Sequence, residues 1–232
     1  MTQILPIHEI FHTFQGEGQW MGSSAFFVRT FGCPVQCPWC DSAGTWHPNW
    51  VPKEIQRMSV EDIVKAVMVS FAPIVVVTGG EPAVHDLEFL VNALHALASV
   101  RVHLETSGGF PIKGDFDWVT LSPKKWGPPL KENVIVASEF KIIVEEKDDI
   151  RLYLDMLTTR GMTPKDTRPI WLHPEWSKRE DPVVLGAIAD AAKHGRGFLR
   201  AGWQLHKLYR VDSRDTRTQP LVPLGGDLRK GY

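Results

Sequence analysis

The chain has 232 residues, of which 43% are hydrophobic and 23% are charged, and this size and composition are typical of one sizeable globular domain. Its 26 Lys and Arg residues nearly balance its 27 Asp and Glu residues, so the chain offers no overall field that favours nucleic acid or a membrane surface. No apolar run reaches the ~20 residues of a membrane span, and the first residues do not resemble a secretory signal. We therefore expect a cytoplasmic protein that binds neither nucleic acid nor a membrane directly.

The predicted secondary structure alternates between strands and helices. Short runs rich in branched and aromatic residues predict strands, which we place at 7–14, 25–31, 74–77, 100–105, 118–121, 139–144 and 170–173. Apolar residues at helical spacing predict helices, which we place after Ser59, around 87–94, and over 148–159 and 182–194. A last extended stretch is expected at 198–208. This alternation indicates an α/β fold with a mainly parallel sheet, open or rolled into a partial barrel.

All three cysteines lie in a long predicted loop over 32–57, with the spacing Cys33-x-x-x-Cys37-x-x-Cys40. An odd number at close spacing argues against a disulfide framework, whereas thiolates suit iron–sulfur clusters and zinc. A 4Fe–4S cluster normally takes one thiolate per iron, so three cysteines leave one iron open to another ligand. A zinc site with His47 as the fourth ligand is one alternative, and a redox dithiol of Cys37 and Cys40 is another.

Further polar motifs follow directly after predicted strands. Thr78-Gly79-Gly80-Glu81-Pro82 comes after one buried strand, and Thr106 and Ser122 come after the next two. The carboxyl ends of parallel strands meet at one edge of a sheet, where ligands gather. Gly79 and Gly80 allow a close approach of the backbone to a ligand, although an ordinary turn before a helix also accounts for them.

These motifs carry a family resemblance. The cysteine spacing with Trp39 inside it, followed by Gly79-Gly80-Glu81-Pro82, resembles the radical S-adenosylmethionine superfamily. Further motifs, found between about 7 and 208, resemble the 7-carboxy-7-deazaguanine synthases within it: they are Phe14-Gln15-Gly16-Glu17-Gly18, Arg29, Asp41-Ser42, Glu105-Thr106-Ser107-Gly108, Ser122-Pro123-Lys124 and His206-Lys207. The resemblance implies a partial (β/α) barrel of the radical S-adenosylmethionine type. It also implies a single domain over 1–232, with a cluster loop at 32–57 and a C-terminal tail at 212–232.

The resemblance implies two cofactors at the cysteine loop. Cys33, Cys37 and Cys40 would hold a 4Fe–4S cluster, and S-adenosylmethionine would chelate its open iron. The residues implied to bind this cofactor are Trp39, Cys40, Asp41, Gly79, Gly80, Glu81, Glu105, Ser122, Pro123, Lys124 and His173. Glu81 is expected to accept a charge-assisted hydrogen bond from the cofactor's ammonium group. His173 stands where the family often has glutamine, and a core or ion-paired histidine is the alternative.

The resemblance also implies a reaction and a substrate site. The family contracts the ring of 6-carboxy-5,6,7,8-tetrahydropterin to 7-carboxy-7-deazaguanine with release of ammonia, a carbon–nitrogen lyase reaction on the route to 7-deazapurines such as queuosine. The implied substrate residues are Phe14, Gln15, Gly16, Glu17, Arg29 and Thr78. Arg29 offers a fork for the substrate carboxylate, with a solvated strand-end charge as the alternative. Ser42, where the family often has threonine, is expected to bind Mg²⁺ that bridges to the carboxylate.

The resemblance also implies partners and a possible role for the tail. The family suggests a homodimer and an electron donor such as flavodoxin or ferredoxin. In the tail, Asp212 and Tyr232 are candidates for a substrate contact that some relatives make with their terminal carboxylate.

A radical-enzyme activase is one alternative function, disfavoured by Gln15-Gly16-Glu17-Gly18 and Arg29, which resemble a site for a small carboxylate. A non-catalytic zinc-binding interaction module is the other.

Overall fold

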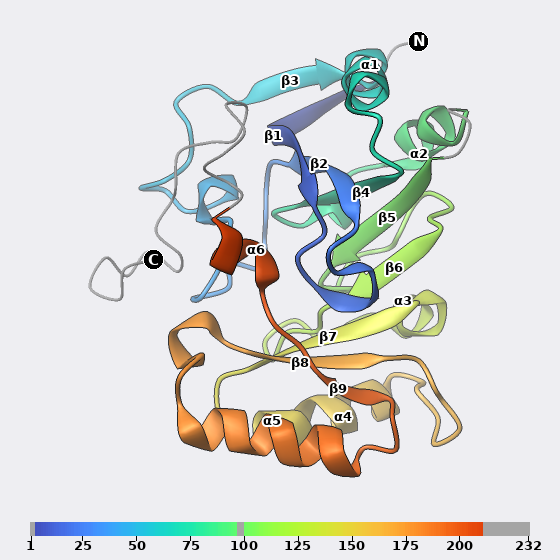
Figure 1. Cartoon of the computed structure of the whole chain (residues 1–232). Helices are drawn as coiled ribbons and strands as arrows, with labels where there is room; N and C mark the ends of the chain where they lie inside the picture. The colour runs from blue at the N-terminus through green and yellow to red at the C-terminus, as the bar shows by residue number, and fades with distance from the viewer. Residues whose placement is uncertain (1–2, 97–99, 211–232) are drawn as a thin grey trace.

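The computed structural model describes residues 3–96 and 100–210, in which nine strands form one sheet in the order β3-β1-β2-β4-β5-β6-β7-β8-β9 (Figure 1). β1 (Ile4–Phe14) pairs antiparallel with β2 (Ser24–Thr30) and with β3 (Gln56–Ser59). From β2 onward every pair is parallel, through β4 (Ile74–Gly79), β5 (Arg101–Thr106), β6 (Trp118–Leu121), β7 (Glu139–Val144), β8 (Ile170–Pro174) and β9 (Leu199–Ala201). The predicted α/β class with a mainly parallel sheet is confirmed.

In the part of the chain that the structure describes, five helices lie between consecutive strands and pack on one face of the sheet: α1 (Val60–Ser70), α2 (Glu88–His95), α3 (Lys131–Val136), α4 (Asp149–Thr159) and α5 (Pro182–His194). A sixth helix, α6 (Leu205–Tyr209), follows the last strand and contributes His206 and Lys207 to the lining of the cavity described below. Ser59 caps α1 as its sequence predicts, because its Oγ accepts a hydrogen bond from the Asp62 N–H at 3.1 Å. In the described residues, no helix is long and apolar enough to span a membrane.

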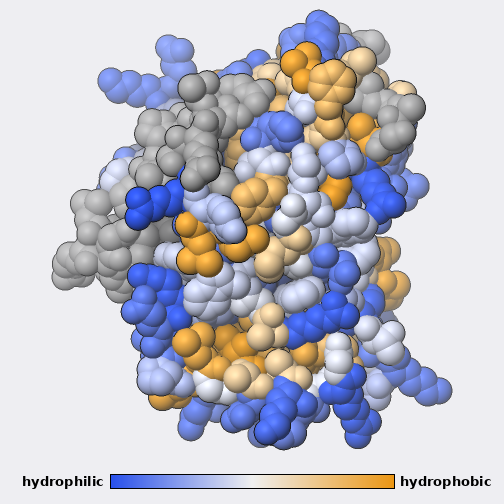
Figure 2. Space-filling view, viewed as in Figure 1, coloured by the Kyte–Doolittle hydropathy of each residue, from blue (hydrophilic) through white to orange (hydrophobic). Residues whose placement is uncertain are grey.

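Two hydrophobic clusters lie between the sheet and these helices. In the first, Val75 and Val77 of β4 pack with side chains of α1 and α2 such as Ile63 and Leu90. In the second, β6, β7 and β8 pack with α3, α4 and α5, and the fully buried Tyr153 belongs to it. Each large side chain buried in this way contributes roughly 1.5–3 kcal/mol. Figure 2 shows hydrophilic side chains around the outline of one face and hydrophobic ones in patches, one of them in the lower third, where α5 lies.

The opposite face of the sheet curves around a cavity. Phe11 of β1, Thr78 of β4 and Lys141 of β7 all line this cavity, although β2, β4, β5 and β6 separate β1 from β7 in the sheet. Strands so far apart can border one space only if the sheet is rolled, which confirms the predicted partial barrel.

Aromatic side chains fill the inside of the barrel next to this cavity. The rings of Phe11 and Phe27 stack at 5.2 Å between centroids. Trp20, from the 3₁₀ turn η1 (Gly18–Trp20), lies 5.7 Å from the ring of Trp118 and 5.4 Å from that of His103. The turn that follows the predicted substrate motif is therefore anchored in the barrel interior.

His103 should make the stability of the protein depend on pH. Burial disfavours the charged imidazolium and lowers the pKa of His103 from 6.5 to about 4, so between these values the unfolded chain binds a proton that the folded chain does not. The free energy of unfolding should therefore fall as pH falls from 6.5 towards 4, by up to about 1.4 kcal/mol per pH unit for this residue. Urea unfolding of the wild type and of His103→Phe, followed from about pH 7.5 to about pH 5, measures the contribution of His103. If the free energy of unfolding had the same pH slope in both proteins, the prediction would be wrong.

β3 and α3 are short elements that were not predicted. β3 falls in the predicted loop 32–57 and the start of the predicted helix, and it pairs only with β1 at the edge of the sheet. Its residues Gln56 and Arg57 are exposed, so this edge strand lacks the apolar alternation on which strand prediction depends. α3 has only six residues, which is too short for a helical pattern to stand out.

The prediction of an extended stretch over 198–208 is wrong in its second half. Only Leu199–Ala201 forms a strand, and Leu205–Tyr209 forms α6. Between them the chain leaves the sheet, and the Leu205 N–H donates to the Gly16 carbonyl at 3.0 Å. Contacts with a distant segment decide the conformation here. The tail at 212–232, with Asp212 and Tyr232, lies outside the described residues.

Candidate active site

A cavity of about 720 Å³ opens at the carboxyl ends of the parallel strands, within the range of small-molecule sites. All the predicted site residues line it except Pro123 and His173. Residues that the sequence analysis did not assign to a site also line it, and they are Glu9, Lys141, Pro174, Glu175, Trp176, Gln204 and Arg210, among others. The structure therefore brings the predicted cluster, cofactor and substrate residues into one cavity.

The three cysteines lie in the cluster loop along one side of this cavity. Cys37 is buried, Cys33 and Cys40 are half-buried, and none is in a disulfide. Burial raises the pKa of Cys37 to about 11 and that of Cys40 to about 12, so without a metal these side chains are neutral thiols. A metal centre displaces the protons when it binds, and the Ser42 N–H, 3.3 Å from Cys40 Sγ, is placed to donate to the sulfur.

The cysteine arrangement fits an iron–sulfur cluster. Among the described residues, no three His, Cys, Asp or Glu side chains are gathered as ligands of a single metal ion. A 4Fe–4S cluster places each thiolate on a different iron, so its cysteines stand around a larger body, and all three thiols here border the same cavity. His47, the fourth ligand of the zinc alternative, accepts the Asn49 N–H on Nδ1 at 3.2 Å.

Gly79 and Gly80 hold the cluster loop against the end of β4. A Cβ on Gly79 would lie 2.7 Å from the Thr30 nitrogen, and one on Gly80 would lie 2.7 Å from the Cys33 Cβ. The Glu81 N–H donates to the Gly32 carbonyl at 2.9 Å. Glycine is thus needed here because Gly79 packs against the end of β2 and Gly80 against the start of the cluster loop, besides any room they leave for a cofactor.

Glu81 joins two neighbouring strand ends. Its carboxylate accepts hydrogen bonds from the Ala83 N–H at 3.1 Å, from Thr106 Oγ1 at 2.6 Å, and from both the N–H and the hydroxyl of Ser107. A carboxylate has about four acceptor positions, so all of them are occupied. The structure thus gives Glu81 a positioning role, and its predicted contact with the cofactor's ammonium stays a prediction.

Lys124 and Trp39 meet on the cofactor side of the cavity. The Lys124 ammonium donates to the carbonyl and the hydroxyl of Ser122 at 2.7 and 2.6 Å, and it lies 5.4 Å from the centre of the Trp39 ring. Burial lowers the pKa of Lys124. Trp126 donates its indole N–H to the Val35 carbonyl at 2.7 Å, which ties the segment after β6 to the cluster loop.

His173 lies behind the cavity wall. It is fully buried, neither ring nitrogen has a hydrogen-bond partner among the described residues, and Gly202 packs against its ring. Burial lowers the pKa of His173 to about 4, so the ring is neutral at pH 7. Its chain neighbours Pro174 and Glu175 line the cavity instead, and a contact of His173 with the cofactor stays a prediction.

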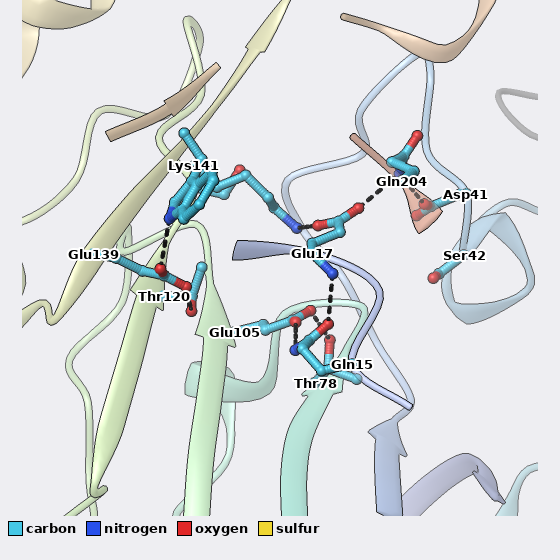
Figure 3. Close-up of polar contacts among 12 residues, drawn as sticks. Gln15, Glu17, Asp41, Ser42, Thr78, Glu105, Thr120, Glu139, Lys141 and Gln204 are labelled. Carbon is cyan, nitrogen blue, oxygen red and sulfur yellow. Dashed lines mark hydrogen bonds and ion pairs between the residues drawn. The ribbon is translucent and has the colours of Figure 1, made fainter. Parts of the chain in front are cut away.

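Glu105 contacts the predicted substrate residues. Gln15 donates to Glu105 Oε1 at 2.9 Å, and Thr78 donates to Glu105 Oε2 at 3.3 Å (Figure 3). The Gln15 side-chain oxygen accepts the Glu17 N–H at 3.2 Å. β4, β5 and the turn after β1 therefore present one connected row of polar groups to the cavity.

Arg29 lies where the sequence analysis expects a carboxylate clamp. Its Nε donates to Glu9 at 2.7 Å, its Nη1 donates to Ser42 Oγ at 2.7 Å, and it lies 5.8 Å from the centre of the Phe11 ring. Arg29 thus spans from β1 to the cluster loop. Ser42 Oγ, the predicted magnesium ligand, faces a cationic guanidinium, and this neighbour does not fit a second cation.

Comparisons with known proteins agree with this geometry. Residues 27–133 match the model of the radical SAM superfamily. The 7-carboxy-7-deazaguanine synthase of Synechocystis sp. is 40% identical over 76% of this chain and 80% of its own, and that of Escherichia coli K12 is 34% identical over 89% and 98%. The crystal structure of QueE from Escherichia coli matches with a TM-score of 0.74 and 31% identity, over 88% of this chain and 95% of that one.

The fold, the cysteine loop and these matches define an enzyme of the radical S-adenosylmethionine type. Within that class, the chain belongs to the 7-carboxy-7-deazaguanine synthase family. Membership implies a 4Fe–4S cluster and S-adenosylmethionine, which the residues of the cavity fit. These matches favour neither the activase nor the zinc-binding module.

Proposed function

We propose that this enzyme is a carbon–nitrogen lyase that converts 6-carboxy-5,6,7,8-tetrahydropterin to 7-carboxy-7-deazaguanine with release of ammonia, within 7-deazapurine (queuosine) biosynthesis. The observation that supports it most is the shared cavity: the cysteine loop and the motif residues Gln15, Glu17 and Arg29 line the same space. Family membership supplies the reaction, and the cavity supplies groups that match both ends of the proposed substrate.

The two ends of the substrate need binding groups of opposite charge. Arg29 can bind the carboxylate through its planar fork, while Glu17 can accept hydrogen bonds from the amine groups of the pterin edge. Gln15 and Thr78 are held beside them by Glu105. When bound, the cluster and S-adenosylmethionine supply the one-electron chemistry that removes a hydrogen from the substrate. The residues of the chain bind and orient the substrate and exclude water.

The predicted cofactor residues fall into two groups, one for the cluster and one for S-adenosylmethionine. We propose that Cys33, Cys37 and Cys40 hold the cluster, and that Trp39, Ser122 and Lys124 border the adenosyl part of S-adenosylmethionine. Asp41 lines the cavity directly after the last cysteine. Magnesium at Ser42 stays a prediction, and we derive no step through it because Arg29 engages that hydroxyl.

Partners follow from the family resemblance. We propose a homodimer that receives electrons from a donor such as flavodoxin or ferredoxin and acts in the cytoplasm on a free pterin. Size-exclusion chromatography with light scattering would show a single mass of twice 26.2 kDa if the dimer is right.

The proposed function is tested by anaerobic turnover. The reconstituted enzyme is incubated with 6-carboxytetrahydropterin, S-adenosylmethionine and reductant, with and without added magnesium. We expect one product lighter than the substrate by one ammonia, and one ammonia released per product. Cleavage of S-adenosylmethionine with no change in the pterin would overturn the proposal.

A further inference from the structure

The carboxylate of Glu17 is bonded on both of its oxygens. Lys141 of β7 pairs with Oε2, and Gln204 donates to Oε1 at 2.8 Å. Figure 3 shows Lys141 and Gln204 pointing at Glu17 from opposite sides. The Gln204 amide also donates to Asp41 at 3.2 Å. Glu17 is therefore fixed in rotation by two partners, one from the barrel wall and one from the segment before α6.

The pair of Glu17 and Lys141 is withdrawn from water. The Glu17 side chain is 8% exposed and that of Lys141 is 15% exposed. Burial alone would raise the pKa of Glu17, but the charge and hydrogen bond of Lys141, together with the nearby His173 and His206, outweigh it and hold the pKa well below its usual range. Glu105 and Asp41 also act on Lys141, whose pKa is raised above its usual range. Lys141 is thus a buried cation that faces three acidic side chains of the cavity wall, Glu17, Glu105 and Asp41.

The same face of β7 also holds the turn that carries Glu17. Two residues before Lys141, Glu139 accepts hydrogen bonds from the Gln19 N–H at 3.0 Å, from Thr120 Oγ1 at 2.7 Å and from Trp171 Nε1 at 2.8 Å. β7 therefore fixes the backbone of this turn through Glu139 and the carboxylate of Glu17 through Lys141. The remaining lone pairs of Glu17 are left for a ligand in the cavity.

We propose that Lys141 is a positioning residue for substrate specificity: it holds the Glu17 carboxylate in the orientation in which Glu17 can accept the N–H groups of the pterin's amino–oxo edge. The inference rests on the proposed function, because it takes that edge as the ligand of Glu17. Lys141 acts through Glu17 and has no contact of its own with the substrate. Losing Lys141 should therefore weaken substrate binding and leave the reacting end of the site unchanged.

The test is a double-mutant cycle of Lys141→Met, Glu17→Gln and both together, with the exposed Lys113→Met as the matched control. Two quantities are measured anaerobically: the Kd of the non-reacting analogue 6-carboxypterin by calorimetry, and KM and kcat for 6-carboxytetrahydropterin. Each single variant should raise Kd and KM about tenfold or more, as expected for a lost charge-assisted hydrogen bond. For Lys141→Met the loss should fall on KM rather than on kcat, and Lys113→Met should match the wild type in every quantity.

The double variant decides the mechanism. If Lys141 acts only through Glu17, the double variant binds the analogue as Glu17→Gln does. A Kd for Lys141→Met equal to the wild-type value, or additive losses in the double variant, would overturn the proposal. If Lys141→Met does not fold, recovery of folding in the double variant with the Kd of Glu17→Gln supports it, and continued failure to fold contradicts it. A wild-type enzyme that neither binds nor converts the pterin refutes the proposed function instead.

Discussion

Replacing Cys40 with alanine should abolish reductive cleavage of S-adenosylmethionine and leave the chain folded. Cys40 borders the cavity together with the other two cysteines of the chain, so the loop cannot supply a replacement thiolate. A lost metal ligand that costs about 4 kcal/mol reduces cluster occupancy about a thousandfold. The readouts are iron and sulfide content, the broad visible absorption of the cluster, and 5′-deoxyadenosine formed from S-adenosylmethionine.

The matched control is Asn49→Ala, an exposed residue of the same loop, which should keep cluster and cleavage. The cysteine variant should retain the circular dichroism of the wild-type apoprotein. Full cleavage activity in Cys40→Ala, or stoichiometric zinc in place of iron in the purified wild type, would refute the assignment of the cysteine loop.

Arg29→Ala should lose turnover of the pterin and retain substrate-free cleavage of S-adenosylmethionine. The substitution removes the cation expected to bind the substrate carboxylate and also leaves Glu9 without its 2.7 Å ion-pair partner. The remaining charge at this end of the cavity is then negative, so it repels the substrate. Truncating one partner of a buried charge pair costs about 2–5 kcal/mol, so kcat/KM should fall by about thirtyfold or more.

Two further variants isolate the cause of that loss. Arg57→Ala removes an exposed arginine of β3 and should leave kcat/KM unchanged. Arg29→Ala combined with Glu9→Gln also removes the negative charge that formed the ion pair with Arg29, so it should recover thermal stability but not wild-type turnover. Normal turnover in Arg29→Ala would show that the substrate carboxylate binds elsewhere.

Most of the fold could be predicted from local patterns. The bounds predicted for β6, β7 and α5 match the structure, because β6 and β7 are short runs rich in branched and aromatic residues and α5 begins with Asp181 and Pro182 as its N-terminal signals. α6 could not be predicted in this way. It has no buried residue, and its position depends on contacts with Gly16 and Glu17, nearly two hundred residues earlier in the chain.

The site could be predicted where a motif carries its residues, as at Gln15, Glu17 and Arg29, and not where its function depends on a partner far away in sequence. Lys141 meets Glu17 across 124 positions. The one local signal is a pair of charged residues, Glu139 and Lys141, within an otherwise apolar strand. Glu105 was predicted to bind the cofactor, which stays a prediction, and its contacts with Gln15 and Thr78 were not predicted. These contacts depend on how β4 and β5 pair in the sheet, which the sequence alone does not show.

The most direct test of the central claim is anaerobic turnover of 6-carboxytetrahydropterin deuterated at carbon 6, followed by mass spectrometry of the deazapurine, of 5′-deoxyadenosine and of the recovered S-adenosylmethionine. Loss of ammonia alone is redox-neutral, so a hydrogen removed from carbon 6 has to be replaced from the 5′-deoxyadenosyl group before the product is released. If this cavity binds the cluster, S-adenosylmethionine and the pterin together, deuterium should appear in that adenosyl group while 7-carboxy-7-deazaguanine accumulates. Adenosyl groups without deuterium, together with unchanged pterin, would contradict the account.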